Sequence, residues 1–258
     1  MRNEFKELAI STARKAGALL KEGLSLEKKI GYKGVGNLVT ETDIKSQELI
    51  VSEITKNLPD HGIISEENLE ERTKARYLWI IDPLDGTTNY AHRYPIFSIS
   101  MALAEEGEII LGVVHDPNFD ELFFAEKGCG AFLNDKPIHV SKTALLNSSL
   151  LATGFPYYIR ERPGKIFRYF QEFSLRSQGV RRAGSAALDL CALACGRIDG
   201  FWEEGLKPWD TAAGSLIVKE ADGTLSKYDG SPFDIYAPQA LATNTLIHQQ
   251  MLRILKEV

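Results

Sequence analysis

Two aspartates three positions apart come directly after an apolar segment. Residues 79–81 (Trp-Ile-Ile) are typical of a buried strand, and Pro83 predicts its end because proline has no N–H for a neighbouring strand. Asp82 and Asp85 are therefore expected where the chain turns. Two carboxylates this close repel each other unless a cation lies between them, and carboxylate oxygens are the ligands that Mg²⁺ binds. The spacing predicts a metal site.

A glycine and a polar run come next, Gly86 and residues 87–89 (Thr-Thr-Asn). Gly86 permits an unusual backbone geometry or a close approach to a ligand. Residues 87–89 predict a helix start, whose free N–H groups attract an anion. Acids beside such a start would repel a phosphate unless hard cations lie between them. Together these features predict metal-assisted phosphoryl chemistry.

A site for two metal ions needs roughly four to six carboxylates from several elements. The further candidates are acids at points where an apolar segment ends and a new element begins: Asp43, Glu66, Glu67 and Asp210. Each of these taken alone is explained as well by a solvated acid or a helix N-cap, and Asp210 before Thr211 is the clearest example. The pair Asp82 and Asp85 resists that explanation, because its two charges repel.

The composition is that of an ordinary globular protein of 258 residues, 44% apolar and 25% charged. A net charge of −5 argues against nucleic acid and acidic membranes as partners, since both favour basic surfaces. No apolar run approaches the roughly 20 residues that span a bilayer, and the first residues lack the apolar core of a signal peptide. We therefore expect a cytoplasmic protein that binds neither membrane nor nucleic acid.

Cysteine and histidine give weaker signals. Three cysteines do not form a disulfide framework. Cys191 and Cys195, four apart in an Ala-rich stretch, are expected to pack one face of a helix, with a metal or redox pair as the alternative. Cys129, between two glycines, is expected in a turn. No metal role is expected for His92 or His115.

Apolar periodicity and turn residues predict a layered α/β pattern. Helices are predicted at 4–24, 42–58, 163–176, 185–195, 211–221 and 245–257, and a loop at 28–37. Strands are predicted at 63–64, 79–81, 149–153, 180–182, 198–202 and 240–243, with antiparallel hairpins at 95–114 and 121–133. Without a long linker, two tightly packed subdomains are expected, 1–145 and 146–258.

Four segments together resemble the signature motifs of the inositol monophosphatase family: residues 37–43, 66–67, 79–90 and 209–214. The resemblance runs from about residue 4 to 257. Residues 181–189 (Arg-Arg-Ala-Gly-Ser-Ala-Ala-Leu-Asp) look like the bacterial, SuhB-like branch of inositol-1-monophosphatases. The resemblance implies an α+β fold layered as an αβαβα sandwich, and a homodimer.

The resemblance also implies two to three Mg²⁺ ions. One would be held by Glu66, Asp82 and the Leu84 carbonyl, and a second by Asp82, Asp85 and Asp210. A third, weaker ion would use Glu66 and waters. Glu66, Thr87 and Asp43 are the implied catalytic residues, which would position or deprotonate the attacking water.

Substrate contacts follow from the same resemblance. The N–H groups of Gly86 and Thr87 would bind the phosphate, with Lys33 close by. Sugar or inositol hydroxyls would be contacted by Gly184, Ser185, Ala186 and Glu203. Arg181 and Arg182 would lie at an interface or on a plain surface, with a second substrate phosphate as the alternative.

The implied activity is Mg²⁺-dependent, lithium-sensitive hydrolysis of inositol monophosphates, with myo-inositol 1-phosphate giving inositol and phosphate. A side activity on fructose 1,6-bisphosphate is expected. Other enzymes of the fold that fit are phosphatases of fructose 1,6-bisphosphate, histidinol phosphate or adenosine bisphosphate. From a different class, the alternative is a regulator that binds the transcription machinery.

Overall fold

A computed structural model describes residues 2–25, 30–34, 37–66, 75–161 and 163–258, with the backbone alone for residues 2, 30–34 and 37–40. Two helices begin the chain, α1 (Arg2–Gly23) and α2 (Glu41–Asn57), close to the predicted bounds. Buried residues recur every three or four positions along α1, so one face of this helix is apolar. They are Phe5, Ala9, Ala13, Ala16 and Leu20.

A seven-stranded sheet receives that face, and its spatial order is the chain order. Its first two strands are parallel and the others antiparallel. The strands are β3 (Gly62–Ser65), β4 (Tyr77–Asp85), β5 (Ser98–Glu105), β6 (Glu108–Asp116), β7 (Glu121–Glu126), β8 (Ala131–Leu133) and β9 (Lys136–Ile138). The two predicted hairpins are confirmed, whereas β9 was not predicted.

The second sheet has five strands in the order β11-β10-β12-β14-β13. They are β10 (Leu150–Thr153), β11 (Gly179–Arg181), β12 (Gly200–Glu204), β13 (Thr224–Ser226) and β14 (Gln239–Thr243). Four were predicted within about two residues, while β13 was not. The helices of this half are α4 (Pro163–Arg176), α5 (Ala186–Ala194), α6 (Pro208–Glu220) and α7 (His248–Glu257), with 3₁₀ turns η1 (Leu146–Ser148) and η2 (Tyr157–Arg160).

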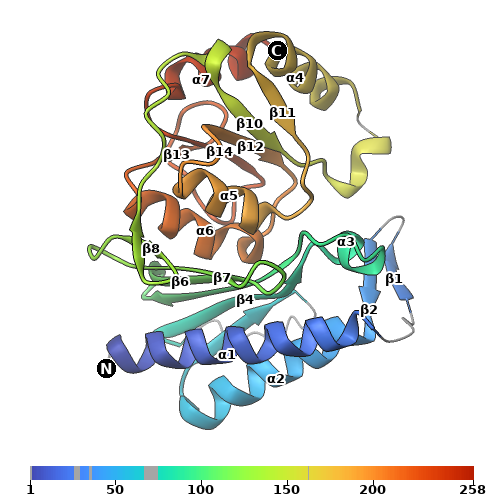
Figure 1. The fold of residues 1–258 in the computed structure, drawn as a ribbon, viewed down its shortest axis with the longest axis vertical. Helices are drawn as coiled ribbons and strands as arrows, with labels where there is room; N and C mark the ends of the chain where they lie inside the picture. The colour runs from blue at the N-terminus through green and yellow to red at the C-terminus, as the bar shows by residue number, and fades with distance from the viewer. Residues whose placement is uncertain (1, 26–29, 35–36, 67–74, 162) are drawn as a thin grey trace.

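Figure 1 shows these elements as five layers. Helices α1 and α2 cover the outer face of the seven-stranded sheet, α5 and α6 lie between the sheets, and α4 and α7 cover the outer face of the five-stranded sheet. The αβαβα sandwich is thereby confirmed. No helix of the described residues is both long and apolar enough to cross a membrane.

The middle layer is packed backbone to backbone. A Cβ placed on Gly112 of β6 would lie 2.7 Å from the carbonyl oxygen of Ala213 in α6, so only glycine allows this approach. At its C-terminal end α6 is fixed by Glu220, whose carboxylate accepts hydrogen bonds from Gly128 N and Gly130 N (2.8 and 2.9 Å). The position of α6 is thus set at both its middle and its end.

Two sequence predictions were wrong. Strand β4 does not end at Pro83 but continues to Asp85, and its pairing with β5 shifts register between Asp82 and Asp85. Pro83 lies in this irregularity, where its missing N–H breaks no regular ladder. The predicted loop at 28–37 contains strand β1 (Ile30–Gly34), paired antiparallel with β2 (Asn37–Thr40), while 28–29 and 35–36 lie outside the described residues.

All three cysteines are free thiols. Cys191 is buried in the core between the sheets, and Cys195 is partly buried with its Sγ 3.5 Å from the Ala192 carbonyl. Burial raises the pKa of both thiols, which disfavours reactive thiolates. The structure supports the packing interpretation, and Cys129 lies exposed in a turn as predicted.

His248 at the start of α7 makes the stability of the protein dependent on pH. Its ring nitrogens lie 2.9 Å from Thr243 Oγ1 and 3.1 Å from Ser226 Oγ. Burial lowers the pKa of His248 below 6.5, so the folded protein keeps the ring neutral while the unfolded chain binds a proton. This histidine should therefore lower the free energy of unfolding as pH falls below about 6.5, by at most about 1.4 kcal/mol per pH unit, until the folded-state pKa is reached.

Urea unfolding of the wild type and His248→Gln at pH 7.5 and 5.5 measures this contribution. We expect the wild type to lose more stability than the variant between the two pH values. Equal losses would show that His248 contributes nothing to the pH dependence.

Candidate active site

The irregular end of β4 buries the two aspartates. The side chain of Asp82 is 1% exposed, and its Oδ1 accepts a hydrogen bond from Leu84 N at 3.0 Å. Burial raises the pKa of Asp82 well above its usual value, and the charges of Glu66, Asp85 and Asp210 raise it further. These four acids are therefore electrostatic neighbours, although they come from distant parts of the chain.

Asp85 is held by the start of α5. Its Oδ2 accepts hydrogen bonds from Ser185 Oγ (2.5 Å) and Ala187 N (2.9 Å), 100 and 102 residues away. Burial raises the pKa of Asp85 to about 6, while these bonds act in the opposite direction. The partial positive charge at the helix start thus helps to keep a carboxylate here.

Asp210 is contributed by the first turn of α6. It is not the N-cap residue, as the simpler sequence interpretation had it: Lys207 occupies that position, and the Asp210 carboxylate accepts from Lys207 N at 2.7 Å. Burial raises the pKa of Asp210 well above its usual value, with further contributions from the charges of Asp85 and Glu66. Trp209, the preceding residue, is partly buried against the core between the sheets.

A second polar group lies beside the aspartates. Thr87 Oγ1 donates to Asp43 Oδ1 (3.0 Å) or to the Leu84 carbonyl (3.1 Å), and both Thr87 and Asp43 are buried. Asp43 comes from the first turn of α2, which is attached to β4 by the Ser46 hydroxyl, a donor to the Pro83 carbonyl. The pair that the sequence resemblance implied is therefore in contact.

Gly86 stands between the aspartates and α3 (Thr87–Ala91). It adopts φ 93°, a left-handed conformation that costs other residues about 1–2 kcal/mol. A Cβ here would also lie 2.9 Å from the Ile96 carbonyl oxygen. The chain can turn from the aspartates into α3 at this point because the residue is glycine.

The oxygen groups of this region are of the type that a hard divalent cation prefers. Glu66, Asp82, Asp85 and Asp210 are carboxylates, and Leu84, between Asp82 and Asp85 in the chain, offers a backbone carbonyl. Hard oxygen donors of this kind suit Mg²⁺ better than a thiophilic metal. Among the described residues, however, no group of three or more Asp, Glu, His or Cys side chains lies close enough together to hold a metal ion as it stands. The charges of the other three acids raise the pKa of Asp82, and those of Asp85 and Glu66 raise the pKa of Asp210. A divalent cation between them would offset this repulsion.

Further polar side chains line the C-terminal half of the site. Burial raises the pKa of Glu203 to about 8, with Asp189 raising and Arg182 lowering it. The Arg182 guanidinium lies 5.7 Å from the centre of the Phe155 ring. Sequence reasoning gave no role to Asp189, whose pKa is raised by burial and by the charge of Asp85. Asp189 was missed because it lies in a helix that is otherwise apolar, residues 186–194.

Tyr157 of η2 is another residue that the sequence did not identify. The residue as a whole is 57% exposed, but its hydroxyl is partly enclosed by protein, which raises its pKa, and the charges of Glu66, Asp85, Asp210 and Asp82 raise it further. The Ser185 hydroxyl, which is expected to contact substrate, donates to Asp85 in this structure. Glu67 lies outside the described residues, and the side chain of Lys33 is not described.

A family model described as "Inositol monophosphatase family" matches residues 1–258. The chain belongs to the inositol monophosphatase family. An inositol-1-monophosphatase of Synechocystis sp. is 44% identical over 254 residues, 96% of this chain and 88% of that protein. A fructose-1,6-bisphosphatase/inositol-1-monophosphatase of Thermotoga maritima is 40% identical over 256 residues, 98% of this chain and 96% of that protein.

Solved structures agree with this assignment. The extragenic suppressor protein suhB from Bartonella henselae has a TM-score of 0.94 at 36% identity, covering 98% of this chain and 99% of that chain. As a member of the inositol monophosphatase family, which is a metal-dependent phosphatase family, this protein is a phosphatase.

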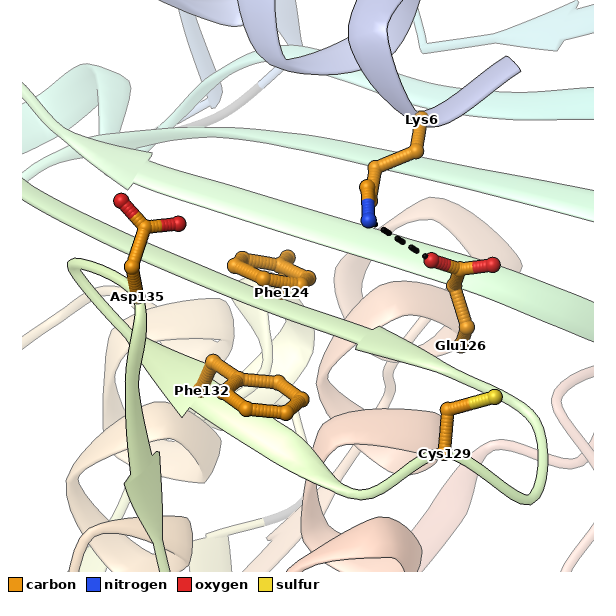
Figure 2. A pocket seen from close by; sticks show the side chains of 6 residues that line it. All are labelled: Lys6, Phe124, Glu126, Cys129, Phe132 and Asp135. Carbon is orange, nitrogen blue, oxygen red and sulfur yellow. Dashed lines mark ion pairs between the residues drawn. The ribbon is translucent and has the colours of Figure 1, made fainter. Parts of the chain in front are cut away.

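Figure 2 shows a separate pocket of about 290 Å³, lined by Lys6, Phe124, Glu126, Cys129, Phe132 and Asp135. Its floor is the stacked pair Phe124 and Phe132, with Lys6 paired to Glu126 at 3.1 Å. Lys6 is near the first turn of α1, whereas Leu20, near the other end of α1, accepts the Tyr90 hydroxyl of α3. The pocket is thus at the opposite end of α1 from the candidate active site.

Thr87→Val tests the polar pair in this phosphatase. Valine keeps the size of the side chain but removes the hydroxyl that donates to Asp43, so we expect kcat for phosphate release to fall by roughly 100-fold, within the range of proton-transfer groups. Thr88→Val, the same change at the exposed neighbouring position, should leave kcat within about twofold. Equal kcat values for the two variants would show that the Thr87 hydroxyl takes no part in catalysis.

Proposed function

We propose that this phosphatase is a Mg²⁺-dependent phosphomonoesterase that hydrolyses inositol monophosphates. The observation that carries the proposal is the electrostatic coupling of four acids from three separate segments. Glu66 follows β3, Asp82 and Asp85 end β4, and Asp210 lies in the first turn of α6; the charges of the other three raise the pKa of Asp82. Such an acidic centre binds a phosphate ester only together with cations.

In this proposal the acids act as metal ligands. Glu66, Asp82 and the Leu84 carbonyl would hold one ion, and Asp82, Asp85 and Asp210 a second, with a third near Glu66. Bound Mg²⁺ supplies a more acidic water and neutralises charge on the transferred phosphoryl group.

The chain's own groups would prepare the attack. When the Thr87 hydroxyl donates its proton to Asp43, its oxygen is left as an acceptor for the attacking water. Glu66 would take up the water proton, and the backbone N–H groups of Gly86 and Thr87 would orient the phosphate.

The substrate's leaving group is proposed to lie against the second half of the chain. Glu203, Gly184, Ser185 and Ala186 would contact its hydroxyls, with Lys33 near the phosphate. Support comes from Asn89, whose amide donates to the Ala183 carbonyl at 2.8 Å and so fixes this segment beside α3. Lithium sensitivity and a homodimer belong to the same proposal.

The test is phosphate release from a panel of esters at equal concentration: myo-inositol 1-phosphate, fructose 1,6-bisphosphate, histidinol phosphate and 3′,5′-adenosine bisphosphate. The proposal predicts the highest kcat/KM for the inositol ester. A kcat/KM at least about tenfold higher for another ester would show that the proposed substrate is wrong, although the protein would still be a phosphatase.

Fructose 1,6-bisphosphate is the second candidate substrate. It is favoured by the Thermotoga maritima relative, which is named for both activities, and by Arg182, which lies near Glu203 and Asp189. An arginine there would pair with the distal phosphate of a bisphosphate. Arg182→Gln should then raise KM for fructose 1,6-bisphosphate more than for myo-inositol 1-phosphate.

A further inference from the structure

The carboxylate of Glu203 lies directly against the backbone of Gly154. A Cβ built on Gly154 would be 2.1 Å from Glu203 Oε1 and 2.2 Å from both Cδ and Oε2, far inside van der Waals contact. The carboxylate therefore fills the space that any side chain at position 154 would need. This contact joins the end of β10 to the adjacent strand β12.

Backbone strain does not explain a glycine at this position. Gly154 is not among the residues with positive φ, so its backbone conformation is open to other residues. The neighbouring strand ends are held together independently of it, because Thr153 Oγ1 donates to the Trp202 carbonyl at 2.6 Å. What the missing side chain provides at 154 is room for the Glu203 carboxylate.

Phe155, the next residue along the chain, contacts a second charged group of the same region, the guanidinium of Arg182. The Arg182 guanidinium lies over the Phe155 ring, 5.7 Å from its centre. The positive charge of Arg182 lowers the pKa of Glu203. Residues 154 and 155 thus contact an acid and a cation that interact electrostatically. A side chain at 154 would meet the acid, Glu203, and not the cation.

We infer that Gly154 is a positioning residue that determines specificity: by lacking a side chain, it holds the Glu203 carboxylate where it accepts hydrogen bonds from hydroxyls of the substrate's leaving group. The inference rests on the proposed function, which places Glu203 beside those hydroxyls. It assigns Gly154 to recognition of polyol and sugar phosphates, as distinct from esters without hydroxyls.

The structure predicts that Gly154→Ala affects recognition far more than folding. The atoms that an alanine Cβ would meet belong to the far end of a flexible glutamate side chain, which can turn away at little cost to stability. The displaced carboxyl group then loses its hydrogen bonds to the hydroxyls, and leaving such groups without a partner corresponds to about 10- to 100-fold in binding.

The experiment compares two substrates: myo-inositol 1-phosphate, and p-nitrophenyl phosphate, whose leaving group carries no hydroxyl beyond the scissile oxygen. For Gly154→Ala we expect KM for the inositol ester to rise about 10- to 100-fold with kcat nearly unchanged, and kcat/KM for the aryl ester to stay within about twofold. Gly164→Ala is the matched control, since no atom of the described residues outside its own stretch of helix lies within 4 Å of a Cβ there, and its φ is not positive.

A double-mutant cycle separates positioning from a merely structural role. In a Glu203→Ala background, Gly154→Ala should add no further rise in KM, because the displaced group is already absent. An equal loss of kcat/KM on both esters, or a further rise in that background, would overturn the inference.

Failure of the proposed function shows in a different measurement. If the wild type releases phosphate from fructose 1,6-bisphosphate but not from the inositol ester, the proposed substrate is wrong, and the same comparison with the sugar ester decides the role of Gly154. A wild type that hydrolyses no hydroxylated ester contradicts both.

Discussion

Asp85→Asn is expected to reduce Mg²⁺-dependent phosphate release by at least about 1,000-fold while the protein stays folded. Asparagine has nearly the same shape and keeps an oxygen that accepts from Ser185 and Ala187. It removes the negative charge that would bind the second ion, and such an ion stabilises the transition state by several kcal/mol, where each 1.4 kcal/mol is tenfold in rate. The measurement is kcat/KM at saturating Mg²⁺, with circular dichroism as the check on folding.

Asp116→Asn is the matched control for this variant. Asp116 is 4% exposed and accepts from Asn118 N and Phe119 N, so it is also a buried aspartate bonded to backbone donors. Burial raises its pKa as it does that of Asp85. We expect Asp116→Asn to keep kcat/KM within about twofold. Similar rates for Asp85→Asn and the wild type would show that Asp85 does not bind a catalytic ion.

Gly112→Ala is expected to have the largest effect on stability. The added methyl group would meet the backbone of Ala213 at 2.7, 3.0 and 3.2 Å, and backbone atoms cannot turn away as a side chain can. Overpacking of a core costs about 1–3 kcal/mol, and we expect the upper end of that range here. For a chain of this length that corresponds to a fall in Tm of roughly 6–12 °C.

The same substitution should also lower activity, because α6 carries Asp210 and would be pushed from the seven-stranded sheet. Gly179→Ala in strand β11 is the control, since a Cβ there meets only side-chain atoms at 3.3 and 3.8 Å. Thermal unfolding followed by circular dichroism distinguishes the two. If both variants unfold at the wild-type temperature, the close approach of β6 and α6 does not constrain the fold.

Local pattern predicted most of the architecture. The apolar stripe of residues 4–24 identified α1, and the aspartate spacing at 82 and 85 pointed to cations before any contact was known, because both signals are contained in a few neighbouring residues. The end of β4 was missed for the opposite reason. Pro83 is tolerated there because β5 shifts its register against β4, a property of two strands together.

Contacts between distant residues could not be predicted in the same way. Ser185 lies 100 residues from Asp85, and nothing in its local sequence shows that its hydroxyl is occupied by that carboxylate. Gly154 and Glu203 are 49 positions apart, and the space that one leaves for the other exists only once β10 and β12 are paired. The sequence thus indicated which residue types do chemistry, while the fold determines which of them meet.

The central claim is that the acids around Asp82 serve phosphate chemistry only together with Mg²⁺. The most direct measurement is inorganic phosphate released from myo-inositol 1-phosphate by protein freed of metal with a chelator, before and after Mg²⁺ is added back. We expect no release above the protein-free rate without the ion, and full recovery at millimolar Mg²⁺. The same rate in the presence of excess chelator would contradict it.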